Sequence, residues 1–295
     1  MSIYSVWGAL EIGLIFGLVA LGVLISFRIL NFPDLTVDGS FPLGGATAAI
    51  LIHHGMDPFL ATLCAVLAAG LAGMITGWLN VSLKIMDLLA SILMMIALYS
   101  INLRVMDAPN IPLINDPTVF TMLQPAGLED YIARPLILLA LVAAVKLLLD
   151  WFFATQIGLA MRATGSNPRM ARSQGIATGG MILLGMAISN ALCGLAGALF
   201  AQSQGGADIS MGIGTIVIGL AAVIVGESIM PSRRLVVATL AVIVGAVVYR
   251  FFIALALNAD FIGLKAQDLN LVTAVLVTVA LVIPLLKQRL RRKGA

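Results

Sequence analysis

Charged residues are scarce in this chain of 295 residues: 17 lysines and arginines and 14 aspartates and glutamates make up only 11% of it. A water-soluble globular domain carries roughly 25% charged residues. Hydrophobic residues, in contrast, make up 61% of the sequence, and the mean hydropathy is +1.08. This composition excludes a soluble globule and predicts a polytopic membrane protein. The apolar runs are long and continuous rather than alternating, so we expect an all-α protein and not a β-barrel.

Motifs for catalysis and for cofactor binding are also missing. The sequence contains no G-x-x-x-x-G-K-[ST] loop for ATP, no H-E-x-x-H metal motif and no Ser/His/Asp arrangement. We therefore expect no catalytic residue, no metal and no cofactor in this chain. His53 and His54 near Asp57 match no metal-ligand spacing, and a loop at the outer face is the simpler interpretation. The two cysteines, Cys64 and Cys193, lie in apolar segments, where we expect both to be buried.

The apolar runs predict about eight to ten transmembrane helices. A span needs about 20 apolar residues, and full-length runs cover residues 7–30, 58–79, 88–105, 136–153, 180–201, 213–229, 235–257 and 269–286. The run at 41–52 is too short to span and follows a polar stretch, 31–40. We expect a broken or re-entrant second helix there, since non-helical backbone at membrane depth needs protein or water to satisfy it.

The distribution of basic residues predicts the orientation. With the C-terminal tail in the cytoplasm, 13 of the 17 basic residues fall on the inner side, which agrees with the excess of Lys and Arg in cytoplasmic loops. The inner set is Arg28, Lys84, Lys146, Arg162, Arg169, Arg172, Arg233, Arg234, Lys287, Arg289, Arg291, Arg292 and Lys293. The N-terminus is then outside. Asp87 and Asp150, at segment ends, are expected to be solvated anchors.

The longest polar interruption is residues 155–176, TQIGLAMRATGSNPRMARSQGI, which has three arginines and no acid. Asn167 before Pro168 predicts a helix start, because Asn caps well and Pro is tolerated at the first helical position. Gly175 predicts the end of this helix, so we expect it to cover 168–174. Gly165 is expected to end the preceding helix in the same way.

This stretch resembles the cytoplasmic coupling loop of ABC importer permeases in the branched-chain amino acid and ribose permease superfamily. The matching residues are Thr155, Gly158, Arg162, Ala163, Gly165, Asn167, Ala171, Gly175 and Ile176. Residues 32–39, FPDLTVDG, are similar to the start of that family's broken second helix, and 194–227 resemble the second half of its pore domain. The stretch FRILNFPDLTVDGSFPLGG is most similar to the subgroup for tryptophan or tyrosine uptake.

The resemblance implies a single permease domain over 1–295, of the type II ABC importer kind, in the bacterial cytoplasmic membrane, with a basic tail at 287–295. Its expected partners are a second copy of the chain, cytoplasmic ATPases that hold ATP and Mg²⁺, an extracytoplasmic solute-binding protein and membrane lipid, without nucleic acid. The solute is expected to be small, such as an amino acid.

Two sets of site residues follow from the resemblance and from the polar positions within the apolar segments. For ATPase coupling we expect Arg162, Ala163, Thr164, Gly165, Asn167, Arg169, Arg172 and Gly175. For the translocation pathway we expect Thr36, Asp38, Gly39, Ser40 and Glu227. Glu227 could instead pair with Arg233 or Arg234 at the membrane interface. The alternative function is an ion-coupled secondary transporter or a channel, but few acids fall in mid-segment.

Overall fold

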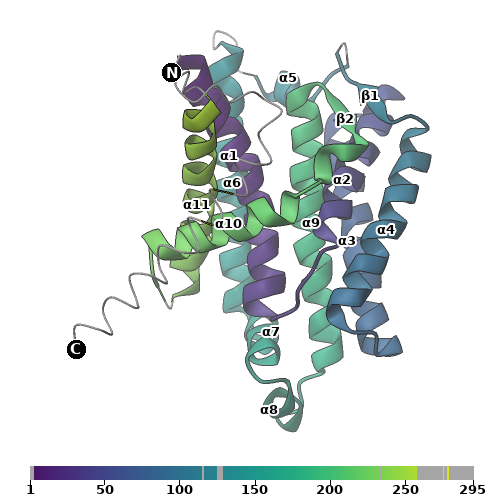
Figure 1. The fold of residues 1–295 in the computed structure, drawn as a ribbon, viewed down its shortest axis with the longest axis vertical. Coiled ribbons are helices and arrows are strands. Elements are labelled where there is room, and N and C mark those ends of the chain that lie inside the picture. The colour runs from purple at the N-terminus through teal and green to yellow at the C-terminus, as the bar shows by residue number, and fades with distance from the viewer. Residues whose placement is uncertain are drawn as a thin grey trace.

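The computed structural model describes residues 3–114, 116–124, 129–232 and 234–257, together with residues 275 and 278. This part of the chain is a bundle of helices (Figure 1). The long helices are α1 (Ile3–Val23, extended by a π-helical stretch η1, Leu24–Ile29), α2 (Val37–His53), α3 (Pro58–Leu83), α4 (Asp87–Met106), α6 (Asp130–Ala154), α9 (Thr178–Gln204), α10 (Thr215–Ile229) and α11 (Leu235–Leu257). The short helices are α5 (Val119–Leu123), α7 (Gln156–Ser166), α8 (Pro168–Ser173) and the 3₁₀ turn η2 (Ile209–Gly212).

The predicted membrane class is confirmed. Within the described residues, seven helical segments are long and apolar enough to cross a membrane. The protein is therefore an all-α multi-pass membrane protein. Apart from residues 275 and 278, the predicted segment at 269–286 lies outside the described residues, as do the basic tail at 287–295 and Arg233.

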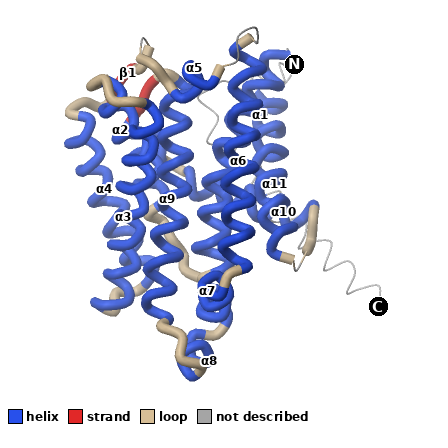
Figure 2. Tube along the Cα trace, turned by 180° about the vertical axis from the view of Figure 1, so that it is seen from behind, coloured by secondary structure: helices blue, strands red, loops and turns tan. Residues whose placement is uncertain are grey.

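Helix α9 lies in the middle of the bundle, between α2, α3 and α1 (Figures 1 and 2). Small residues let α2 approach it closely. A Cβ atom on Gly44 would lie 2.1 Å from the carbonyl oxygen of Gly194, and one on Gly197 would lie 1.8 Å from that of Phe41. Membrane helices that pack this closely have glycine or another small residue at the contact, because a larger side chain would hold the two backbones apart.

Helix α2 begins inside the bundle, which confirms the predicted broken second helix. The chain from Asn31 to Thr36 is not helical, and Thr36 Oγ1 lies 3.0 Å from Thr76 Oγ1 on α3. One turn later, Ser40 donates to Asn190, which lies about 18 Å along α9 from its start at 1.5 Å per residue. The helix itself is longer than the apolar run suggested, because it starts at Val37 and includes the polar residues of its first turn.

Helix α10 also begins inside the bundle, which the sequence analysis did not predict. Its Ile216 N–H donates to Asp38 Oδ1 at 2.7 Å, so its start lies beside the first turn of α2. From there α10 runs obliquely to the region of Arg28, at the end of α1 (Figure 1). The run at 213–229, predicted as a full-length span, contains a 15-residue helix, about 22 Å long, that starts at the depth where α2 starts.

A small cap closes the end of the bundle opposite α7 and α8 (Figure 2). Strand β1 (Asn110–Pro112) pairs antiparallel with β2 (Gly206–Asp208), and α5 lies nearby. These elements lie between the predicted apolar segments, and none of them was predicted from the sequence. Cys193 is buried as expected, but Cys64 is exposed on α3, so that prediction is wrong for Cys64. A long face of α3 is apolar and exposed in the single chain, and hydropathy alone does not separate such a face from the core.

Candidate functional site

Helix α8 projects beyond the ends of the membrane-length helices, and α7 lies beside the lower end of α9 (Figures 1 and 2). The short α8 forms as predicted, from Pro168 to Ser173. The side chain of Asn167 accepts a hydrogen bond from the Met170 N–H at 3.1 Å, and Gly175 has a φ of +80°. Nearly all of α8 is exposed, and only Ala171 is buried. A two-turn helix is marginal on its own, so its exposed side suits a partner surface.

Gly165 does not end α7 as predicted. The helix continues to Ser166, and the absent side chain at Gly165 makes room for a neighbour: a Cβ atom there would lie 1.8 Å from the carbonyl oxygen of Ile29 in η1. Thr164 is buried behind it, with its hydroxyl donating to Ala160 O. Helix α7 is thus packed directly against the end of α1.

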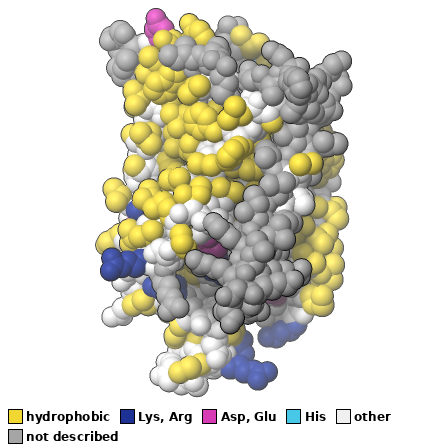
Figure 3. Space-filling model, turned by 60° about the vertical axis from the view of Figure 1, so that its left-hand side comes forward, with side chains coloured by type: hydrophobic (Ala, Val, Ile, Leu, Met, Phe, Trp, Pro, Cys, Tyr) yellow, Lys and Arg dark blue, Asp and Glu magenta, His cyan; other side chains and the backbone are white. Residues whose placement is uncertain are grey.

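The three predicted coupling arginines are in different environments. Arg162 and Arg169 are exposed, and in the described part of the chain neither makes a side-chain hydrogen bond or ion pair. The Arg172 Nε–H donates to Thr178 Oγ1 at 2.8 Å, which ties α8 to the start of α9. Figure 3 shows Lys and Arg side chains gathered at this lower end of the molecule, below a wide hydrophobic surface.

Glu227 pairs with Arg28, which was not among the partners predicted for it from the sequence. Its Oε1 accepts from Arg28 Nε at 2.8 Å, so the predicted pairing with Arg234 is wrong. This ion pair joins η1 to the end of α10. It borders a cavity of about 550 Å³ that Arg162, Gly165 and Ser166 of α7 also line. An exposed pair of this kind contributes little to stability, about 1 kcal/mol or less, so its position is more informative than its strength.

The polar residues that begin α2 divide into two groups. Thr36 and Ser40 are fully buried between helices and face no cavity in this single chain, so their place on the translocation pathway stays a prediction. With Asp34 they form a network: Asp34 Oδ2 accepts from Asn190 Nδ2 at 2.8 Å, and Ser40 donates to Asn190 Oδ1 at 2.7 Å. This network gives hydrogen-bond partners to the polar groups at the start of α2, inside the bundle, because buried polar groups need such partners.

Asp38 and Gly39 lie on the other side of α2, where they line a cavity. Asp38 accepts from the N–H of Ile216, and at 3.4 Å from that of Gly214, so its carboxylate faces the start of α10. The cavity has a volume of about 410 Å³ and lies between α2, α4 and the η2 turn. Two of the predicted pathway residues thus border an open space at the point where two discontinuous helices meet.

Comparison with known proteins identifies the family. The family model described as the permease component of the branched-chain amino acid transport system matches residues 6–286. The chain belongs to this permease family. The predicted membership of this permease superfamily is therefore confirmed.

Relatives of the permease carry transport names. It is 40% identical over 264 residues to a tyrosine transport system permease protein of Clostridioides difficile (strain R20291), covering 90% of this chain and 86% of that protein. It is 28% identical over 177 residues to a galactofuranose transporter permease protein of Escherichia coli (strain K12), covering 59% and 50%. The solved structure of PsaBC from Streptococcus pneumoniae in complex with Fab is similar in fold, with a TM-score of 0.54 at 14% identity, covering 95% of this chain and 91% of that one.

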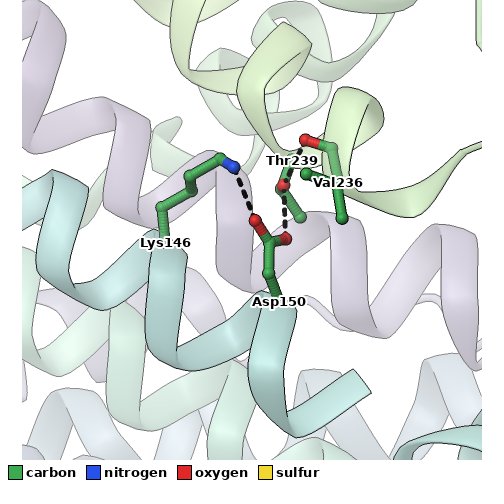
Figure 4. Close-up of polar contacts among 4 residues, drawn as sticks. All are labelled: Lys146, Asp150, Val236 and Thr239. Carbon is green, nitrogen blue, oxygen red and sulfur yellow. Dashed lines mark hydrogen bonds and ion pairs between the residues drawn. The ribbon is translucent and has the colours of Figure 1, made fainter. Parts of the chain in front are cut away.

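One partly buried ion pair of the permease was not predicted from the sequence. Asp150 is not a solvated anchor. It lies 2.5 Å from Lys146 on the same helix and accepts from the Thr239 hydroxyl of α11 at 2.8 Å (Figure 4). The i, i+4 spacing of Lys146 and Asp150 was the available signal. In the described residues, His53, His54 and Asp57 form no group that could hold a metal. Asp57 caps α3 instead.

Proposed function

We propose that this permease is the membrane-spanning subunit of an ABC importer, which carries an amino acid delivered by a binding protein and is driven by separate ATPases. The observation that supports it most directly is the projecting, basic α7–α8 element on a chain of this family. The similarity to a tyrosine transport system permease protein favours an aromatic amino acid as solute. Two copies of the chain would enclose the pathway.

The contacts suggest how movement of α8 would reach the pathway. Helix α7 touches η1 at Gly165, and η1 carries Arg28, which pairs with Glu227 at the end of α10. The opposite end of α10 lies against Asp38 beside the cavity. A displacement of α8 by an ATPase would therefore be passed through α7 and η1 to α10, and along α10 to the cavity. In this mechanism the ion pair between Arg28 and Glu227 is a mechanical link.

Reconstitution tests this function. We expect the permease, assembled in vesicles with its ATPase and binding protein, to take up labelled tyrosine only when ATP is hydrolysed on the α8 side. Uptake should be insensitive to imposed H⁺ or Na⁺ gradients, because the energy comes from the ATPase. Uptake by the permease alone, driven by an ion gradient, would instead support the ion-coupled alternative.

We also infer that the α7–α8 end is cytoplasmic. Arg28, Lys84 and Arg234 are at this end with the three arginines of 155–176. Arg104, in the last turn of α4, and Arg134, near the start of α6, are at the other end. Such an excess of basic residues is typical of the inner side.

Cysteine labelling in whole cells tests the orientation. In a Cys64→Ser background, a membrane-impermeant maleimide should modify Pro109→Cys from outside and leave Ser173→Cys unmodified until the cells are opened. Both positions are exposed, so access from one side is the only difference. Labelling of Ser173→Cys in intact cells would reverse the proposed orientation.

A further inference from the structure

The cavity beside Asp38 has the composition of a ligand site. Its lining combines polar groups from α2 and α4 with an apolar wall: Asp38, Gly39, Pro42, Met95, Ile96, Tyr99, Ser100, Asn102, Ile209 and Ile213. It lies where α2 and α10 both begin inside the bundle. Transport proteins commonly place their substrate site at such discontinuous helices, because the helix ends and the irregular backbone supply polar groups at membrane depth.

The side chain of Asn102 contributes a carbonyl oxygen that accepts no hydrogen bond from the described residues. Its side chain is 1% exposed, and its Nδ2 donates to the Gly39 carbonyl oxygen at 3.1 Å. That bond fixes the orientation of the amide, since the reversed amide would place two acceptors together. Asn102 Oδ1 is then buried and, among the described residues, has no hydrogen-bond partner. A buried acceptor without a donor is destabilising and rare in native proteins, so a ligand that donates an N–H here would be favoured.

Asp38 adds negative charge to the same cavity. Both of its contacts are with backbone N–H groups of the α10 start, and Oδ2 has only the 3.4 Å contact to Gly214. A carboxylate oxygen accepts more than one hydrogen bond, so Oδ2 can take another donor. None of the described residues that line the cavity is basic. The polar side of the cavity therefore suits a donor of positive charge.

The remaining wall is apolar and carries one aromatic ring. Met95, Ile96 and Tyr99 come from consecutive turns of α4, and Ile213 comes from the segment that leads into α10. These side chains can contact the apolar or aromatic body of a small molecule whose amine is at Asn102 and Asp38.

We propose that this cavity is a subsite for the solute in transit, and that it binds the amino group of an amino acid. The amine donates to Asn102 Oδ1 and Asp38 Oδ2, and the solute side chain lies against Ile96 and Tyr99. This rests on the proposed import function and assigns its selectivity for amines to residues of this chain. A lipid tail in the same space would leave Asn102 Oδ1 without a donor, which disfavours lipid as the occupant.

Protection from thiol labelling tests the subsite. In the assembled complex, with Cys64→Ser, Ser100→Cys places an almost isosteric thiol in the cavity wall. L-tyrosine and tyramine should slow its modification by a small hydrophilic maleimide, whereas 3-(4-hydroxyphenyl)propanoate, which lacks the amine, should not. Ala97→Cys is the matched control, because Ala97 is exposed on the same helix but does not line the cavity. Its labelling should be unaffected by all three compounds.

Two variants examine the recognition itself. Asn102→Leu should raise the tyrosine concentration needed for protection by roughly tenfold, as expected for the loss of one hydrogen bond to a charged group. If that variant does not fold, Ile96→Trp, which fills the cavity from its exposed wall, should abolish protection and uptake, whereas Leu93→Trp on the same helix should retain both.

The outcomes separate the subsite from the import function. ATP-driven tyrosine uptake without protection of Ser100→Cys, or equal protection by the compound without an amine, would overturn the subsite alone. Protection by amines in a complex that shows no ATP-driven uptake would keep the subsite and overturn the importer.

Discussion

The substitution Gly197→Ala is expected to destabilise the permease by about 3 kcal/mol or more, and Gly197→Leu should prevent its folding. A Cβ atom at this position would lie 1.8 Å from the carbonyl oxygen of Phe41 and 2.8 Å from its carbonyl carbon. Overpacking usually costs about 1–3 kcal/mol when side chains can shift. Here the obstacle is backbone, so α2 and α9 would have to separate along their shared face.

Separation of these helices would also disturb the aromatic cluster that they form with α1. Phe41 stacks on Phe16 with ring centroids 5.8 Å apart, and Phe200 contacts both rings. Stability is measured from the thermal transition of the purified permease in detergent. The control is Gly180→Ala in the same helix, where nothing lies within 4 Å of the added Cβ. It should stabilise slightly, because Ala favours helix more than Gly does. Equal transitions for the two variants would contradict the packing argument.

Much of the fold could be predicted because hydropathy and helix signals are local. The long apolar runs located the helices, and Asn167 with Pro168 and Gly175 located α8 to within one residue. The polar stretch before residue 41 correctly indicated a broken second helix. These features depend on neighbours in sequence, so a single sequence contains them.

The rest depends on depth and on partners far apart in the chain. Hydropathy reports how long an apolar run is but not where it starts in the membrane, so the start of α10 inside the bundle was missed. The partner of Glu227 is Arg28, 199 residues away, and no local rule connects them. Gly165 has a similar explanation, since a glycine that allows close packing resembles one that ends a helix until its neighbour is known.

Only part of the candidate site could be predicted, because the contacts that form it join residues far apart in the chain. Asp38 and Gly39 were expected on the pathway from the resemblance and from the polar stretch that contains them. Both line the cavity, and their place on the pathway stays a prediction. Asn102 was not considered, although an Asn in an apolar segment is a signal in itself, because polar residues inside a membrane are often functional. Asp34 was assigned only to a polar chain, and its contact with Asn190 depends on how α2 and α9 pack.

Reversing the charge at Arg162 and Arg169 together is expected to uncouple transport while leaving the permease folded. Both side chains are exposed, and neither has a polar side-chain partner in the described part of the chain, so Arg162→Glu with Arg169→Glu removes no hydrogen bond or ion pair of the fold. If α8 meets acidic groups on the ATPase, like charges then face each other, which costs several kcal/mol. The affinity for the ATPase should fall by roughly a hundredfold, so less ATPase should copurify with the permease. ATP-driven uptake should be lost.

The matched control for this prediction is a basic residue at the same end of the bundle but outside the α7–α8 element. Lys84 is exposed at the end of α3, so Lys84→Glu makes the same change in charge as Arg169→Glu alone. It should leave ATPase association and uptake near the level of the unaltered permease, whereas Arg169→Glu should lower both. Arg172 is not used, because its bond to Thr178 would make any loss ambiguous. Normal ATPase binding and uptake in the double variant would show that the projecting basic element does not receive the ATPase.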